Sequence, residues 1–201
     1  MELEDIIKST STLFLKYGIR SVTMDDVAKS LSISKKTLYQ YVDDKTDLVE
    51  KSVVFISNMF DTSHYNKSEN KNVVEKYIDL YKEISSIIKE NNHSFEYDLK
   101  KYYPQLFQSM KDGRRKVVMT KMTKDMEDGI EQGFFRSDLS IKKIVILHII
   151  RIESLKDNEL LQKYNYTLVD IIDEMFNYHF HAIATQKGIK EYKRLNLLNH
   201  E

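Results

Sequence analysis

The sequence has no cysteine, and only 1 proline and 5 glycines interrupt its 201 residues. Without cysteine the chain can form no disulfide, thiolate nucleophile, Fe–S cluster or cysteine zinc site, and the cytoplasm is the compartment we expect. The scarcity of proline and glycine, together with abundant Leu, Ile, Lys and Glu, favours uninterrupted helices. No segment alternates apolar and polar residues for long enough to predict a sheet. The fold class we expect is therefore all-α.

Long apolar runs and an excess of one charge are also missing. The most apolar run is IVILHII at residues 144–150, which is far too short to cross a bilayer, so we expect no membrane partner. The first residues, MELEDIIKST, carry acids where a signal peptide would carry a basic segment. Because 31 basic residues balance 31 acidic ones, any contact with a polyanion has to come from local placement of charge.

Motifs for catalysis and metal binding are absent from the sequence as well. It contains no glycine-rich phosphate loop, no HExxH motif and no GxSxG motif. His179 and His181 are close in sequence, but a spacing of two residues places them about 200° apart around a helix, where they cannot share a metal. We therefore expect no enzymatic activity, no metal site and no cofactor.

Helix caps predict two short helices close together near the start of the chain. Thr23 is a good N-cap, and Asp26, three residues later, completes an aspartate variant of the capping box. After a tight turn at Ser32 and Ile33, Ser34 caps a second helix, which is short and polar. Two short helices joined in this way form a helix-turn-helix, a motif that can enter a DNA groove.

A set of residues between Ile6 and Leu48 has a recognisable order and spacing. Its members are Leu13, Phe14, Gly18, Thr23, Val27, Ala28, Ile33, Ser34, Thr37, Leu38, Tyr39, Tyr41, Lys45 and Leu48. By these residues the segment resembles the DNA-binding domain of the TetR family of bacterial repressors. It departs from the family at Ser32, where glycine is common, and at Val42, where an aromatic residue is usual.

The resemblance implies two domains and a set of DNA-binding side chains. Residues 1–50 would form a three-helix, helix-turn-helix DNA-binding domain, and residues 51–201 a larger helical domain for ligand binding and dimerisation. The candidate DNA-binding residues are Thr23, Ser34, Lys35, Lys36, Thr37, Tyr39, Gln40, Tyr41 and Lys45. Lys36 and Gln40 lie four residues apart and are our candidates for base readout, since lysine can donate to guanine and glutamine can pair with adenine. The side chains best suited to phosphates are those of Thr23, Thr37, Tyr39, Tyr41 and Lys45.

The second domain is predicted to consist of helices. They are predicted at residues 45–66, 70–91, 95–101, 104–131, 140–156 and 164–187. Aromatic and methionine side chains are dense between Phe95 and Phe135, where they can line an adaptable pocket for a small ligand or simply form core. The candidate pocket residues are Phe95, Tyr102, Tyr103, Phe107, Met110, Met122, Met126, Phe134 and His148.

The last two predicted helices are apolar around much of their circumference. One face can meet the core of the domain while another still needs a partner, which predicts a homodimer. The candidate interface residues are Ile144, His148, Ile152, Ile172, Met175, Phe176, His179, Phe180 and Ile183.

The function that we predict is a TetR-like transcriptional repressor. It would bind a palindromic operator in double-stranded DNA as a homodimer, and an unknown small-molecule inducer would release it. The alternative is a helical protein–protein interaction module that uses the same helices without specific DNA binding. The two differ in their binding to random duplex DNA, which should weaken steeply with salt for a repressor and be absent for the module.

Overall fold

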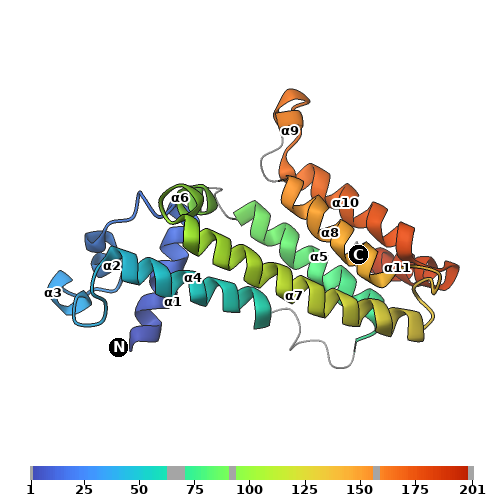
Figure 1. Cartoon of the computed structure of the whole chain (residues 1–201), viewed down its shortest axis with the longest axis horizontal. Coiled ribbons are helices and arrows are strands. Elements are labelled where there is room, and N and C mark those ends of the chain that lie inside the picture. Colours follow the sequence, from blue (N-terminus) through green and yellow to red (C-terminus); the bar gives the residue numbers. More distant parts are fainter. Residues whose placement is uncertain (1, 63–70, 91–93, 156–158, 199–201) are drawn as a thin grey trace. The chain divides into compact units, whose positions relative to one another are not determined.

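The computed structural model describes residues 2–62, 71–90, 94–155 and 159–198. Within these ranges the regular elements are helices (Figure 1). An isolated antiparallel bridge also pairs Phe135 with Ala184. The helices are α1 (Leu3–Tyr17), α2 (Met24–Ser30), α3 (Lys35–Leu38), α4 (Lys45–Thr62), α5 (Val73–Glu90), α6 (Ser94–Tyr102), α7 (Pro104–Glu131), α8 (Ile141–Leu155), α9 (Glu159–Lys163), α10 (Leu168–Ile183) and α11 (Gln186–Leu198). The predicted all-α fold class is confirmed.

The chain divides into two compact units. Unit 1 consists of Met1–Ser63 and Glu90–Arg114, and unit 2 consists of His64–Lys89 and Arg115–Glu201. The predicted domain boundary after residue 50 falls inside α4, and α6 belongs to unit 1 although it comes much later in the sequence. The division into domains at residue 50 stays a prediction.

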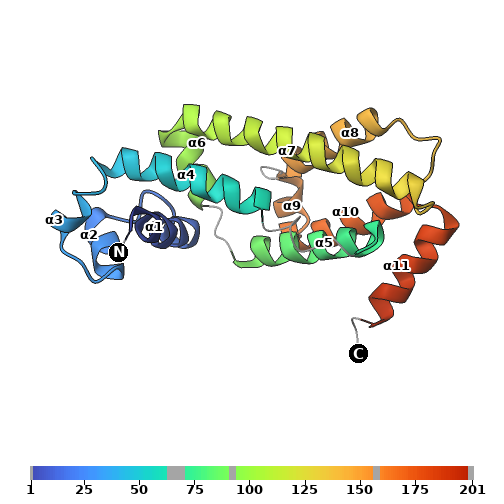
Figure 2. The ribbon, with the colours of Figure 1, turned by 90° about the horizontal axis from the view of Figure 1, so that it is seen from below.

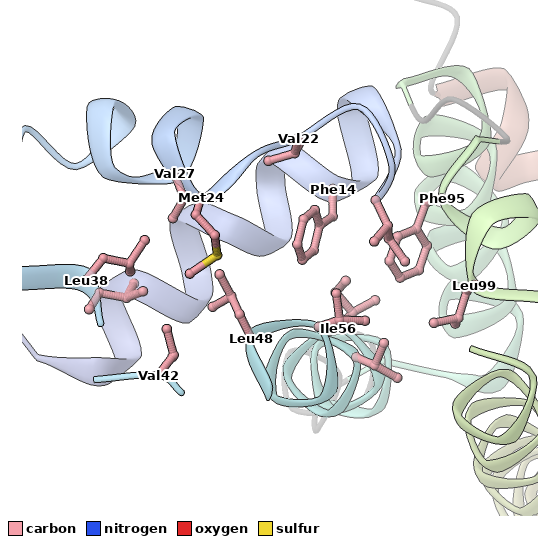
Figure 3. Packing of buried hydrophobic residues seen from close by; sticks show 14 of the residues in the cluster. Phe14, Val22, Met24, Val27, Leu38, Val42, Leu48, Ile56, Phe95 and Leu99 are labelled. Atoms are coloured by element: carbon pink, nitrogen blue, oxygen red, sulfur yellow. The ribbon is translucent and has the colours of Figure 1, made fainter. Parts of the chain in front are cut away.

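The core of unit 1 joins the short N-terminal helices to α4 and α6. Phe14 of α1, Leu38 of α3 and Leu48 of α4 are buried in one cluster, which Phe95 and Leu99 of α6 extend (Figure 3). A helix as short as α3 is not stable alone, because nucleation costs more than one turn of hydrogen bonds returns. Burial of a leucine side chain contributes roughly 1.5–3 kcal/mol, so the Leu38 anchor is what holds α3 in place.

The core of unit 2 is centred on Phe180 of α10. The Phe180 ring lies 5.0 Å from that of Tyr77 on α5, 6.0 Å from Phe135 and 4.4 Å from Tyr192 on α11, measured between centroids. Figure 2 shows α5 running beside α10, and the rings of Tyr77 and Phe176 are 5.6 Å apart. Aromatic pairs at these distances add about 0.5–1.5 kcal/mol each beyond the area they bury.

The predicted helix over residues 164–187 is wrong at both ends. Thr167 forms a capping box with Asp170, so α10 begins at Leu168. At the other end the backbone N–H of Thr185 donates to the carbonyl of Phe134, and its hydroxyl accepts from the N–H of Gly188 to start α11. The short α9 was not predicted either. The other predicted helices agree with the structure to within a few residues, while residues 63–66, 70, 91 and 156 lie outside the described ranges.

Candidate nucleic-acid interface

The first helix of the pair, α2, is fixed by the predicted capping box. The Thr23 hydroxyl accepts from the backbone N–H of Asp26 at 3.2 Å, and the Asp26 carboxylate accepts from the Thr23 backbone N–H at 2.9 Å. The same carboxylate accepts from the Thr23 hydroxyl at 2.6 Å, and these hydrogen bonds hold the pKa of Asp26 below its usual value. The Thr23 side chain therefore serves the cap, while remaining exposed at the start of α2.

The turn between α2 and α3 is tight and left-handed at one residue. Ser32 has φ 56°, its N–H donates to the carbonyl of Lys29, and the N–H of Ile33 donates to the carbonyl of Ala28. Non-glycine residues adopt this conformation at a cost. This agrees with the family resemblance, since glycine is common at this position. The Ile33 side chain packs against the core and fixes the direction in which α3 leaves the turn.

Ser34 caps α3, and Leu38 anchors it. The Ser34 hydroxyl accepts from the N–H of Thr37 at 3.0 Å and lies 2.8 Å from the Thr37 hydroxyl, so these two candidate side chains hold each other. Lys36 and Gln40 are both exposed. However, α3 ends at Leu38, and the N–H of Gln40 donates to the carbonyl of Thr37, which places Gln40 in a tighter turn after the helix.

An ion pair that the sequence did not reveal links the two helices. The Lys35 ammonium lies 3.0 Å from the Asp25 carboxylate, and this hydrogen bond raises the pKa of Lys35. Both side chains are exposed, so the pair contributes little to stability. The ion pair directs the Lys35 side chain toward α2. Lys36, in the same turn of α3, is exposed.

Lys45 lies at the start of α4, beside a capped helix end. The Asp44 carboxylate accepts from the N–H of Asp47 at 2.9 Å, so Asp44 is the cap. Lys45 is half-buried, and this burial lowers the pKa of its ammonium, while Asp98 and Asp26 act in the opposite direction. Tyr39 is 46% exposed, whereas Tyr41 is half-buried against the core, so the two predicted phosphate-binding tyrosines differ in their access to solvent.

A second contact missed by the sequence reasoning joins α6 to the loop after α1. The buried carboxylate of Asp98 accepts from the backbone N–H of Arg20 at 2.7 Å, and the Arg20 guanidinium donates to the Tyr102 hydroxyl at 3.0 Å. Gly18, in the same loop, has φ 83°, and a Cβ there would lie 2.9 Å from the Cβ of Ser94. No local pattern relates residues separated by about eighty positions, so only the fold reveals this contact.

The predicted pocket residues divide between the two units. Unit 1 contains Phe95, Tyr102, Tyr103, Phe107 and Met110, and unit 2 contains Met122, Met126, Phe134 and His148. Three of the nine are buried in hydrophobic core: Phe95 and Met110 in unit 1, and Met126 in unit 2. Phe134 lines a surface pocket of about 500 Å³ with Lys187, Lys190, Glu191 and Arg194.

The predicted interface residues on α10 face their own chain. Phe180 and Ile183 are 0% and 2% exposed, and Ile172, Met175, Phe176 and His179 are also buried within unit 2. Their predicted placement on an outward face is wrong, because α5, α8 and α11 already cover that stripe. On α8, Ile144, His148 and Ile152 are half-buried.

Among the described residues, no cluster of three or more His, Asp or Glu side chains could hold a metal ion. Within the same ranges, no helix has both the length and the apolar character needed to cross a membrane.

The capped helix pair, its buried anchor and its exposed polar face form a helix-turn-helix. Residues 6–51 match the family model described as bacterial regulatory proteins, tetR family. The chain belongs to the TetR family of transcriptional regulators.

Characterised relatives include two staphylococcal proteins named biofilm operon icaADBC HTH-type negative transcriptional regulator IcaR. The one from Staphylococcus epidermidis is 29% identical over 161 residues, covering 69% of this chain and 85% of the relative. The one from Staphylococcus aureus strain Newman is 27% identical over 146 residues, covering 59% of this chain and 73% of the relative.

Solved structures share the fold at low sequence identity. A TetR-family regulator from Cytophaga hutchinsonii has a TM-score of 0.69 at 14% identity, covering 92% of this chain and 95% of its own. A TetR regulator from Haloarcula marismortui has a TM-score of 0.69 at 16% identity, covering 91% of this chain and 98% of its own.

Proposed function

We propose that this regulator represses transcription by binding a palindromic operator through α2, α3 and the start of α4. The observation that carries the proposal is the helix-turn-helix itself, in which caps and a buried anchor present the exposed side chains of Lys36 and Gln40. Lysine and glutamine can both bond base edges in the major groove. Repression rather than activation is supported by the staphylococcal relatives, which are named negative regulators.

Phosphate contacts come from the residues that flank this face. Lys35 and Lys45 carry cations next to the caps of α3 and α4, where backbone N–H groups also favour anions. The negative charges of Asp25, Asp26 and Asp44 do not argue against DNA binding, because these side chains are occupied by an ion pair or by caps.

Dimerisation uses the outer face of α8 in this proposal. Ile146, Leu147 and Ile150 are 41%, 60% and 58% exposed, and Tyr178 on the adjacent α10 is 72% exposed. Helices α8 and α10 are neighbours, since the rings of His148 and His179 lie 4.9 Å apart (Figure 1). A contiguous apolar face of this kind is typical of a protein–protein interface, and two-fold pairing would place two copies of α3 on one operator.

Selection from a library of random DNA duplexes tests the proposal. We expect the purified protein to enrich a palindromic site whose half-sites are about one helical turn or more apart. Affinity for that site and for scrambled duplexes should fall steeply as salt increases, because bound phosphates release counterions. Failure to enrich any sequence, together with no salt-dependent binding to random duplexes, would favour the alternative, a helical protein–protein interaction module.

Release by a small molecule belongs to the same proposal. An inducer that binds more tightly to the DNA-free form lowers operator affinity, and operator lowers inducer affinity by the same factor, typically about 5- to 150-fold. A regulator whose operator affinity no ligand changes would be constitutive.

A further inference from the structure

Three basic side chains of unit 2 meet between α8 and α10. His148 and Arg151 lie three residues apart on α8, and the Nη2 of Arg151 is 3.1 Å from the Nδ1 of His148. The ring of His179 on α10 is 4.9 Å from that of His148. Because a guanidinium only donates hydrogen bonds, Nδ1 of His148 accepts here, so this imidazole is neutral and carries its proton on Nε2.

Two polar atoms of this basic cluster are buried without forming a hydrogen bond to the described residues. The Nε of Arg151 and the Nε2 of His179 are buried and have no hydrogen-bond partner in the part of the chain that the structure describes. His179 is only 7% exposed as a whole. A buried donor without an acceptor costs free energy, so folded proteins rarely leave one unless it has another role.

Aromatic side chains border the basic cluster. The Tyr77 ring stacks on His179 at 6.4 Å, and the Tyr77 hydroxyl already donates to the carbonyl of Phe176. Burial lowers the pKa values of His148 and His179. His179 and Arg151 lower that of His148 further, and Arg151 lowers that of His179 further. Burial lowers the pKa of the Arg151 guanidinium, and the groups that act in the opposite direction are Tyr77 and Tyr178.

The other arginines of unit 2 each bind a carboxylate, and no such partner is found for Arg151 among the described residues. Arg115, Arg136 and Arg194 each use Nε and Nη2 together to hold a carboxylate, on Glu153, Asp138 and Glu191 respectively. These two nitrogens form one edge of the guanidinium, which matches the two oxygens of a carboxylate. On Arg151, Nη2 of this edge contacts the imidazole of His148. Its Nε has no acceptor among the residues that the structure describes.

We propose that the Nε–Nη2 edge of Arg151 binds the carboxylate of a small organic acid, with Nε2 of His179 donating to the same group. The ligand oxygen replaces Nδ1 of His148 as the acceptor for Nη2, and the second oxygen accepts from Nε. The rings of Tyr77 and Phe176 border the apolar part of the acid. A monoanion fits best, because Arg151 supplies one permanent positive charge and a second negative charge would remain buried and unpaired.

This site gives the proposed inducer a chemical class, and its effect on operator binding rests on the proposed function. Binding of the acid itself does not, since it is measured on the protein alone. The two can therefore fail separately.

The first measurement uses the wild-type protein and two pairs of probes. Phenylacetate and hexanoate are compared with their neutral amides at millimolar concentrations, while the ¹H–¹⁵N signals of the arginine Nε–H groups are followed. We expect the two acids to shift the Arg151 signal saturably and the amides to leave it in place. The signal is assigned by its loss in Arg151→Lys. Inorganic phosphate, a dianion in part at neutral pH, should bind more weakly than either acid.

Calorimetry on variants supplies the second measurement. Arg151→Lys keeps the charge but removes the two-pronged edge, so affinity for the acids should fall at least about tenfold. Arg194→Lys, which changes an arginine already paired with Glu191, is the matched control and should bind as the wild type does. Circular dichroism checks that both variants are folded.

The possible results separate cleanly. If neither acid shifts the Arg151 signal saturably, or if Arg151→Lys binds the acids as tightly as Arg194→Lys, the carboxylate site is wrong whatever the DNA experiments give. If the acids bind through Arg151 but leave operator affinity unchanged, the site stands and the ligand response of the proposed function is wrong.

Discussion

Ser32 occupies a backbone conformation that suits glycine better than serine. Its φ of 56° lies in the left-handed region, in the turn that sets the angle between α2 and α3. The penalty for a side chain there exceeds the entropy that glycine loses on folding, so Ser32→Gly should raise the free energy of unfolding by about 0.5–1 kcal/mol. Urea denaturation monitored by circular dichroism measures this change. A stability equal to or below that of the wild type would mean that the turn carries no strain.

The His148 and His179 pair should make unit 2 sensitive to acid. Burial lowers the pKa of His148 to about 3 and that of His179 to about 4, from an ordinary value of 6.5. The unfolded chain therefore takes up protons first, so stability is full above pH 6.5 and is lost as the pH falls toward the folded-state values. We expect the melting temperature to drop between pH 6.5 and pH 4. The His148→Gln, His179→Gln double variant should show a smaller drop, and an unchanged slope would contradict the assignment.

Residue-scale predictions from the sequence succeeded where the chemistry is local. The caps at Thr23 and Ser34 and the turn at Ser32 depend on groups within a few residues of each other, so their spacing alone reveals them. Contacts such as that between Arg20 and Asp98 depend on how distant helices pack. An aromatic residue such as Phe95, which is buried in the core, gives the same signal in the sequence as one that lines a pocket.

At the scale of elements, we expect the turn after α3 and the start of α4 to make different contacts with DNA. Gln40→Ala should lower affinity for the preferred base at one operator position by about 1–3 kcal/mol and leave scrambled duplexes unaffected. Lys45→Ala should weaken binding to operator and scrambled duplexes alike and reduce the salt slope by about one unit, because it removes the proposed phosphate contact. Fluorescence anisotropy on both duplexes compares the variants. The reverse pattern, with Lys45→Ala altering base preference, would exchange their roles.

Helix boundaries in the second half of the chain show the limit of periodicity. The apolar pattern of α10 continues through Ala184, so a single helix to residue 187 was predicted. The chain instead turns there, because Thr185 bonds the carbonyl of Phe134 and caps α11. A residue that caps one helix while bonding a distant loop cannot be recognised from spacing alone. The start of α7 at Pro104, by contrast, was predicted correctly, since proline favours the first helical turn.

At the scale of the whole molecule, the same limit applies to the predicted dimer face. The stripe on α10 is apolar enough to suit a second subunit, but its residues are buried in the core of unit 2. On α8, by contrast, Ile146, Leu147 and Ile150 are apolar residues that stay exposed. An amphipathic pattern shows that a face is covered, whereas the fold shows whether the same chain covers it.

Charge placed on the outer face of α8 should therefore separate the proposed dimer without unfolding the chain. Leu147→Glu and Ile150→Glu change side chains that are 60% and 58% exposed, so each variant should keep its helical circular dichroism and melting temperature. Sedimentation should show monomers, and operator affinity should fall sharply because one half-site then binds alone. Phe180→Glu, at a fully buried position, should instead unfold unit 2, and Gln186→Glu, at an exposed position, controls for the added charge. If Leu147→Glu and Ile150→Glu both remained dimeric with full operator affinity, the two subunits would have to meet through another surface.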